Sequence, residues 1–129
     1  MKKKYLIVIA NYYEDISKGL LDSALKLLKN SKTIKIIEVP GVFEIPITIS
    51  KNIKKYDAFL ALGCVIKGET PHFDFISQAS TTAIMDLSIN YKKPVGNGII
   101  TCLNMSQALA RKKKGAEAAK AVISVTSQK

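Results

Sequence analysis

Four strand-like stretches, each followed by a helical pattern, limit the folds open to this chain. The stretches at residues 5–10 and 58–65 carry no charged side chain, as expected of strands buried on both faces. Residues 33–39 and 95–101 are the other two predicted strands, the last interrupted or ended tightly at Gly96 and Gly98. Because helical patterns alternate with the strands, we expect a parallel sheet with right-handed crossovers and helices on both faces.

The helical patterns repeat apolar residues at intervals of three or four positions. Ile45, Ile49 and Ile53, for example, lie four apart and share one helix face. The predicted helices cover residues 16–28, 42–53, 71–90, 104–111 and 115–127. With 129 residues, of which 47% are hydrophobic, the chain is long enough for one domain with one core, so we predict a single domain over residues 1–129.

In a parallel sheet of this kind, ligands bind beyond the carboxyl ends of the strands, where the strand order reverses. Four connecting loops are therefore the candidate site: residues 11–14, 40–44, 64–72 and 101–104.

The loop at residues 64–72 holds the only histidine of the chain. Thr70 followed by Pro71 is typical of a helix N-cap with proline at the first helical position. His72 then lies in the first helical turn, beside free N–H groups that attract anions, and it can accept a proton near pH 7. A capped helix with a partly exposed histidine of no catalytic role is the alternative.

The chain has 20 basic and 10 acidic residues, a formal charge of +10. Its lysines are scattered, and no aromatic residues are interleaved with them as in nucleic-acid-binding proteins, so we expect no nucleic-acid partner. Arg111 is the sole arginine. A planar, bidentate donor at one position suits phosphate binding, although a single residue can also occur there by chance.

Several chemistries are excluded by what the loops lack. A glycine-rich phosphate loop is missing after the first strand, and one histidine with two separated cysteines does not make a structural metal site. A receiver domain would need acidic residues where Asn11 and Cys64 stand. A nucleophilic Cys64 with His72 as its base remains an alternative, although no third orienting group is evident.

Two features of the sequence bear on the cellular location: the positions of the two cysteines and the lengths of the apolar runs. Cys64 and Cys102 fall at the ends of predicted strands, which indicates buried, reduced thiols in a cytoplasmic protein. The apolar run after the N-terminal lysines is too short for a signal peptide, and no stretch is long enough to span a membrane.

What the loops do contain is an aromatic platform (Tyr12, Tyr13 and Phe43), a helix N-terminus with His72, a carboxylate or two, and Arg111. Stacking rings, phosphate donors and a base suit a planar heterocycle and a small phosphorylated partner. Each feature also has a structural explanation, since the tyrosines can pack a loop, Phe43 can belong to the core, and Glu44 can favour a helix start.

Specific sequence segments narrow this further. They are residues 39–46 (VPGVFEIP), 61–74 (ALGCVIKGETPHFD), 98–101 (GIIT) with Gln107, Ala108 and Arg111, and 114–119 (KGAEAA). In the same order and over nearly the whole chain, they resemble the signature segments of the lumazine synthase family. For the fold we accordingly expect a three-layer α/β/α sandwich with a four-stranded parallel sheet in the order 2-1-3-4, which is flavodoxin-like.

The resemblance implies condensation of 5-amino-6-(D-ribitylamino)uracil with 3,4-dihydroxy-2-butanone 4-phosphate, without metal or cofactor, in the penultimate step of riboflavin synthesis. It implies that His72 transfers protons and that Arg111 binds the phosphate. The other implied contacts are Tyr12 stacked on the pyrimidine, Val42, Phe43 and Glu44 at the ribityl chain, Cys64, Val65 and Ile66 at the ring edge, and Glu69 and Thr70 at the phosphate. Family sites lie between subunits of a pentamer, so Asn97 and Arg111 would come from the adjacent chain of a pentamer or pentamer-based assembly.

This sequence departs from the common family pattern in several places. Asn11, Tyr12 and Tyr13 replace the usual Arg-Phe-Asn, and Asn97 stands where many members carry phenylalanine. The connection after Arg111 is several residues shorter, and the sequence begins almost at the first strand. Two other functions are alternatives: a noncatalytic flavin- or pteridine-binding module on the same scaffold, and a basic RNA-binding protein.

Overall fold

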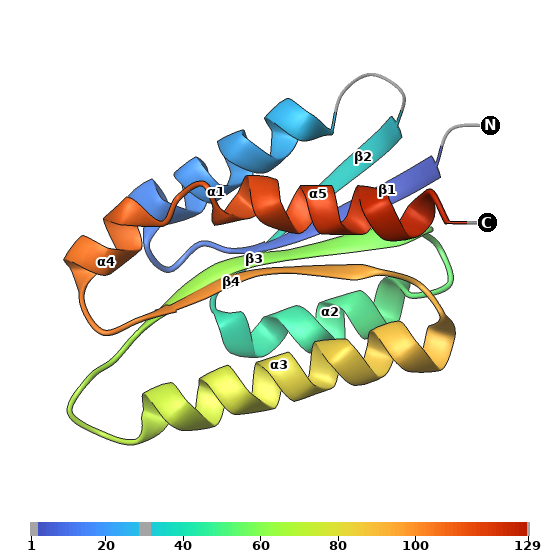
Figure 1. The fold of residues 1–129 in the computed structure, drawn as a ribbon. Coiled ribbons are helices and arrows are strands. Elements are labelled where there is room, and N and C mark those ends of the chain that lie inside the picture. The colour runs from blue at the N-terminus through green and yellow to red at the C-terminus, as the bar shows by residue number, and fades with distance from the viewer. Residues whose placement is uncertain (1–2, 29–31, 129) are drawn as a thin grey trace.

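The structure, a computed structural model, describes residues 3–28 and 32–128. Strands and helices alternate along the chain as predicted from the sequence (Figure 1). The elements in chain order are β1 (Lys3–Ala10), α1 (Glu14–Leu27), β2 (Lys32–Val39), the short 3₁₀-helix η1 (Val42–Glu44), α2 (Ile45–Asn52), β3 (Ala58–Ile66), α3 (His72–Tyr91), β4 (Val95–Cys102), α4 (Met105–Ala110) and α5 (Lys114–Thr126).

The four strands form one parallel sheet in the order β2-β1-β3-β4, which confirms the predicted order 2-1-3-4. Strand β1 pairs with both β2 and β3, and Ile7 faces Ile36 on one side and Leu60 on the other. The chain adds β2 on one side of β1 and then adds β3 and β4 on the other side. The reversal of strand order therefore lies between β1 and β3. The carboxyl ends of these two strands are where a ligand site is expected.

Helices cover both faces of the sheet and make the predicted three layers (Figure 1). On one face, alternate residues of β1 such as Tyr5 and Ile7 pack against α1 and α5. On the other face, Leu6 and Val8 belong to the second core, with α2 and α3. Both sets are fully buried, which explains why β1 has no polar residue between Tyr5 and Ala10.

Two predictions of local structure were wrong. Strand β4 runs without a break through Gly96 and Gly98, which pair with Leu60 and Leu62 of β3. Gly96 is needed there because α5 lies directly on the strand, and a Cβ on it would sit 2.5 Å from the carbonyl oxygen of Ala118. At Gly98 a Cβ would instead meet the side chain of Leu62 in β3.

The start of α3 is also shifted. Pro71, not Thr70, is the N-cap residue, because its carbonyl accepts the first helical hydrogen bond from the Phe75 N–H at 3.2 Å. The Thr70 hydroxyl still accepts a long bond of 3.4 Å from the His72 N–H. His72 is therefore the first helical residue and remains in the first turn, as predicted.

Cys64 and Cys102 are both buried and free, as expected. They come from neighbouring strands, since Ile66 faces Cys102 in the register of β3 and β4. None of the helices within the described ranges has the length and apolar character needed to cross a membrane.

Candidate functional site

A cavity of about 560 Å³ opens at the carboxyl ends of β1 and β3, at the reversal of strand order. Its walls come from the loop after β1, from η1, from the end of β3 and from the first turns of α3. The lining residues are Tyr12, Tyr13, Gly41, Val42, Phe43, Glu44, Cys64, Val65, Ile66, His72 and Ile76. We call this the histidine cavity. Its volume is within the range of small-molecule sites, and its lining is mostly apolar with a few polar groups, as such sites usually are.

Two exposed aromatic side chains, Tyr12 and Phe43, line this cavity. Tyr12 is 73% exposed and Phe43 is 66% exposed, whereas Ala10 at the end of β1 is only 1% exposed. Aromatic rings exposed to this degree at a cavity offer flat apolar surfaces on which a planar heterocycle can stack.

Tyr13 supports Tyr12 from within the cavity. Their ring centroids are 4.8 Å apart in an edge-to-face arrangement with an interplanar angle of 81°. Burial raises the pKa of the Tyr13 phenol, with smaller contributions from Tyr12 and Cys64. The phenol of Tyr13 is therefore neutral near pH 7, and it lines the cavity together with Tyr12 and Cys64.

The end of β3 forms the deep part of the cavity. Cys64 is 6% exposed, and burial raises the pKa of its thiol to about 12, with further contributions from Cys102. A thiol with such a pKa is neutral at pH 7, and a neutral thiol is a poor nucleophile. This argues against Cys64 as an attacking group activated by His72. Beside it, Gly63 lets η1 approach closely, because a Cβ there would lie 2.8 Å from the Val42 side chain.

His72 is exposed and lines the cavity from the first turn of α3. Glu69 and Thr70 lie on the exposed loop just before it and are not among the residues that line the cavity. The helix start supplies backbone N–H groups on the same side, since the N–H of a first-turn residue has no partner inside its own helix.

A second cavity, of about 550 Å³, lies along β4, which is the outer strand of the described sheet, and the connection between α4 and α5. Its lining residues are Asn97, Ile99, Ile100, Thr101, Ala110, Arg111, Lys113, Lys114 and Glu117. We call this the arginine cavity. It shares no lining residue with the histidine cavity, so Arg111 and His72 do not meet in one chain through either cavity.

Arg111 is held by β4 while part of its guanidinium stays available. Its Nη1 donates to the Thr101 carbonyl at 3.3 Å and to the Cys102 sulfur at 3.9 Å. Within residues 3–28 and 32–128, the other guanidinium nitrogens make no hydrogen bond. Asn97 is less free, because its side-chain oxygen accepts a bond of 3.0 Å from the Ile99 N–H.

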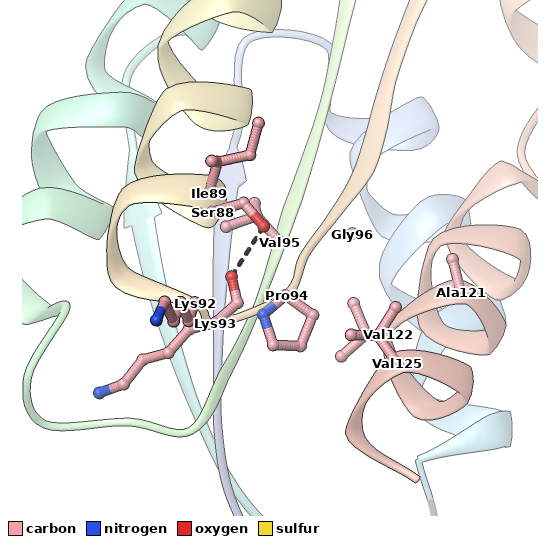
Figure 2. Close-up of a pocket in the computed structure, with 10 residues that line it drawn as sticks. All are labelled: Ser88, Ile89, Lys92, Lys93, Pro94, Val95, Gly96, Ala121, Val122 and Val125. Atoms are coloured by element: carbon pink, nitrogen blue, oxygen red, sulfur yellow. Dashed lines mark hydrogen bonds between the residues drawn. The ribbon is translucent and has the colours of Figure 1, made fainter. Parts of the chain in front are cut away.

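Two further cavities are poorer candidates. Figure 2 shows one of about 300 Å³ at the amino end of β4, between the end of α3 and α5. Two of its polar side chains are already engaged. The Ser88 hydroxyl donates to the Lys93 carbonyl at 2.8 Å (Figure 2), and Lys93 Nζ donates to the Ile53 carbonyl at 2.7 Å. The other is a mainly apolar groove of about 450 Å³ between α2 and α3. In the described part of the chain, no cluster of three or more His, Cys, Asp or Glu side chains is arranged to hold a metal ion.

The structure brings together His72 and seven predicted substrate contacts in the histidine cavity: Tyr12, Val42, Phe43, Glu44, Cys64, Val65 and Ile66. It puts Asn97 and Arg111 in the arginine cavity, and Glu69 and Thr70 in neither. Sequence reasoning missed Ile76 as a lining residue. It included Gly41 only as part of the candidate loop 40–44, and it put Tyr13 in the aromatic platform without a defined substrate contact. It also assigned no role to Lys113 or Glu117, although the lysine run after Arg111 was a usable signal.

Comparison with known proteins agrees with this geometry. The family model of 6,7-dimethyl-8-ribityllumazine synthase matches residues 2–129. The 6,7-dimethyl-8-ribityllumazine synthase 1 of Rhodopseudomonas palustris is 44% identical over 95% of this chain and 83% of its own length. The 6,7-dimethyl-8-ribityllumazine synthase of Agrobacterium fabrum is 40% identical, with 97% and 94% covered, and that of Bartonella bacilliformis is 45% identical, with 85% and 76% covered. The chain belongs to the 6,7-dimethyl-8-ribityllumazine synthase family.

Proposed function

We propose that this protein condenses 5-amino-6-(D-ribitylamino)uracil with 3,4-dihydroxy-2-butanone 4-phosphate to give 6,7-dimethyl-8-ribityllumazine, the penultimate step of riboflavin biosynthesis. The observation that carries the proposal is the histidine cavity. Exposed aromatic rings, a carboxylate and the only histidine line one space at the reversal of strand order, in a chain of this family. The aromatic rings can stack on a planar pyrimidine, the carboxylate can accept hydrogen bonds from a polyhydroxyl chain, and the histidine can transfer protons at a ketone.

In this proposal the pyrimidine lies in the histidine cavity. Tyr12 stacks on the ring, and the backbone and side chains of residues 64–66 contact its edge. The residues of η1 hold the ribityl chain, where the Glu44 carboxylate can accept hydrogen bonds from its hydroxyl groups. Tyr13 keeps the platform in position through its edge-to-face contact with Tyr12.

The reaction needs no protein nucleophile. The amine of the pyrimidine attacks the ketone, water leaves, and an imine forms. Inorganic phosphate is then eliminated, and the remaining amine closes the ring with loss of a second water. His72 moves protons between the amine, the carbonyl oxygen and the carbon skeleton, a contribution of about 10²–10⁴ in rate. The larger contribution is that two reactants are held in contact with their reacting atoms aligned.

The phosphate requires a second chain. We propose that the phosphate binds where the first turn of α3, with Glu69 and Thr70 nearby, meets the arginine cavity of an adjacent subunit. Arg111 of that subunit then contributes its free guanidinium donors, and Asn97 contributes a neighbouring wall. The separation of the two cavities within one chain supports this arrangement, because a complete site needs both.

We propose a homo-oligomer, a pentamer or an assembly of pentamers. Its support is the apolar surface outside the two cores. On α3, Phe75, Met85 and Ile89 are 67%, 56% and 64% exposed, and Ile47 of α2 is 59% exposed. A helix that is apolar on both of its faces is normally buried on both. Light scattering on the purified protein measures the assembly mass, and a monomer at micromolar concentration would contradict the proposal.

The two free, buried thiols support a location in the cytoplasm, where thiols stay reduced. Cell fractionation tests this. For the activity itself, the purified protein is mixed with both substrates, and lumazine absorbance and fluorescence are followed over time. Omission of either substrate is the control. A rate no higher than the uncatalysed background, with folded protein, would contradict the proposed function.

A further inference from the structure

Three consecutive lysines follow Arg111 in a very short connection. Helix α4 ends at Ala110 and α5 begins at Lys114, so only Arg111, Lys112 and Lys113 lie between them. The Lys114 N–H donates to the Arg111 carbonyl at 3.0 Å, which closes the connection into a tight turn. The three lysines therefore follow Arg111 closely in space, but they differ in what they contact.

Lys112 and Lys114 already have structural roles. The side-chain stem of Lys112 packs against Gly19 of α1, where an added Cβ would lie 2.5 to 2.9 Å from it. Its carbonyl also accepts a bond of 3.1 Å from the Ser23 hydroxyl. Lys114 forms an ion pair with Glu117 one helical turn later, with 3.7 Å between Nζ and Oε1.

Lys113 differs from both. It is exposed and lines the arginine cavity together with Arg111. Its ammonium group makes neither a hydrogen bond nor an ion pair within residues 3–28 and 32–128. Because Glu117 neutralises Lys114, the cavity retains two uncompensated cations, Arg111 and Lys113. A phosphate monoester carries a charge of about −1.5 to −2 at pH 7, which two cations can balance.

We propose that Lys113 is a second cationic contact for the phosphate of the phosphorylated substrate. Together with Arg111, it determines how tightly this substrate binds. This rests on the proposed function, because the phosphate is that of the substrate named there. Arg111 supplies a planar pair of donors, and Lys113 supplies a point charge on a flexible stem that can follow the phosphate as it leaves. The short connection is what brings the lysine to the cavity.

The test compares Lys113→Met with Lys120→Met in the full-length, assembled protein. Both remove one positive charge from an exposed lysine, but Lys120 lies on α5 away from the arginine cavity. We expect Lys113→Met to raise the KM for the phosphorylated substrate about 3- to 10-fold, with kcat and the KM for the pyrimidine nearly unchanged. Lys120→Met should leave all three constants as they are, and Lys113→Arg should restore the affinity.

A second readout does not depend on turnover. Inorganic phosphate is titrated into each protein by calorimetry, and its affinity should fall in Lys113→Met but not in Lys120→Met. The difference should shrink as potassium chloride is added, because salt screens exposed charges. Equal phosphate affinities and equal KM values in the two variants would overturn the role of Lys113 while turnover persists. Absence of turnover in the unmodified protein would instead contradict the proposed function, and the phosphate titration would still decide on Lys113.

Discussion

The separation of His72 and Arg111 into two cavities allows a quantitative test with mixed assemblies. If each site combines the histidine cavity of one subunit with the arginine cavity of the next, then His72→Ala and Arg111→Ala damage different halves of a site. Both residues are exposed, so neither substitution opens a hole in the core. Each variant alone has a damaged half in every site and should be nearly inactive.

Random mixing of the two variants in equal amounts restores some sites. A given site has an intact His72 in half of the cases and an intact Arg111 in half of the cases, so about a quarter of the sites are intact in both halves. The mixture should therefore show about a quarter of the unmodified activity per subunit, well above either parent. The two variants carry different affinity tags and are co-expressed, and doubly tagged assemblies are purified before lumazine formation is measured.

A second mixture makes the test sharper. The double variant His72→Ala/Arg111→Ala is mixed with unmodified subunits in equal amounts. Shared sites again leave about a quarter of the sites intact, whereas sites within single chains leave about half. Activity of the first mixture equal to the mean of its two parents, together with half activity in the second, would refute the shared site.

Three further predictions concern single residues. The substitution His72→Ala should slow turnover about 10²–10⁴-fold and leave measurable activity, because positioning of the substrates persists; complete loss in a folded, assembled protein would argue against that. Lys92 ends α3 in the left-handed region, with φ of 54°, so Lys92→Gly should raise the free energy of unfolding by about 1 kcal/mol, and a lower urea midpoint would contradict this. Burial raises the pKa of Cys64 from 9.0 to about 12, so the unfolded chain loses this proton first as pH rises. Stability should then fall above about pH 9 by up to about 1.4 kcal/mol per pH unit from this group, and Cys64→Ala should fall less steeply in urea titrations at pH 8 to 10.

The arrangement of the elements could be predicted because it depends on patterns that lie close together in the sequence. The apolar run from Tyr5 to Ala10 is long and free of polar residues because both faces of β1 are covered. Alternation of such runs with helical patterns leaves few topologies, and the family resemblance selected the order 2-1-3-4 among them. The location of the histidine cavity could be predicted as well, because the carboxyl ends of neighbouring parallel strands lie together at one edge of the sheet.

The errors arose where distant parts of the chain decide local structure. Gly96 and Gly98 suggest a break when β4 is considered alone, but both lie within the strand. A Cβ on Gly96 would meet the backbone of α5, and a Cβ on Gly98 would meet the Leu62 side chain of β3. The three lysines after Arg111 also differ in their contacts. Lys112 packs against α1 and Lys114 pairs with Glu117 of α5, and a run of identical residues cannot indicate such differences. Nor does the sequence of one chain show that His72 and Arg111 line separate cavities.

The central claim is that this chain makes lumazine and releases phosphate in one condensation. The most direct measurement follows both products in one reaction, with lumazine separated by chromatography and identified by mass, and with inorganic phosphate measured in the same samples. Our account predicts that the purified protein forms both products well above the uncatalysed rate and in equal amounts. Phosphate release without lumazine, or neither product above background in a folded assembly, would contradict it.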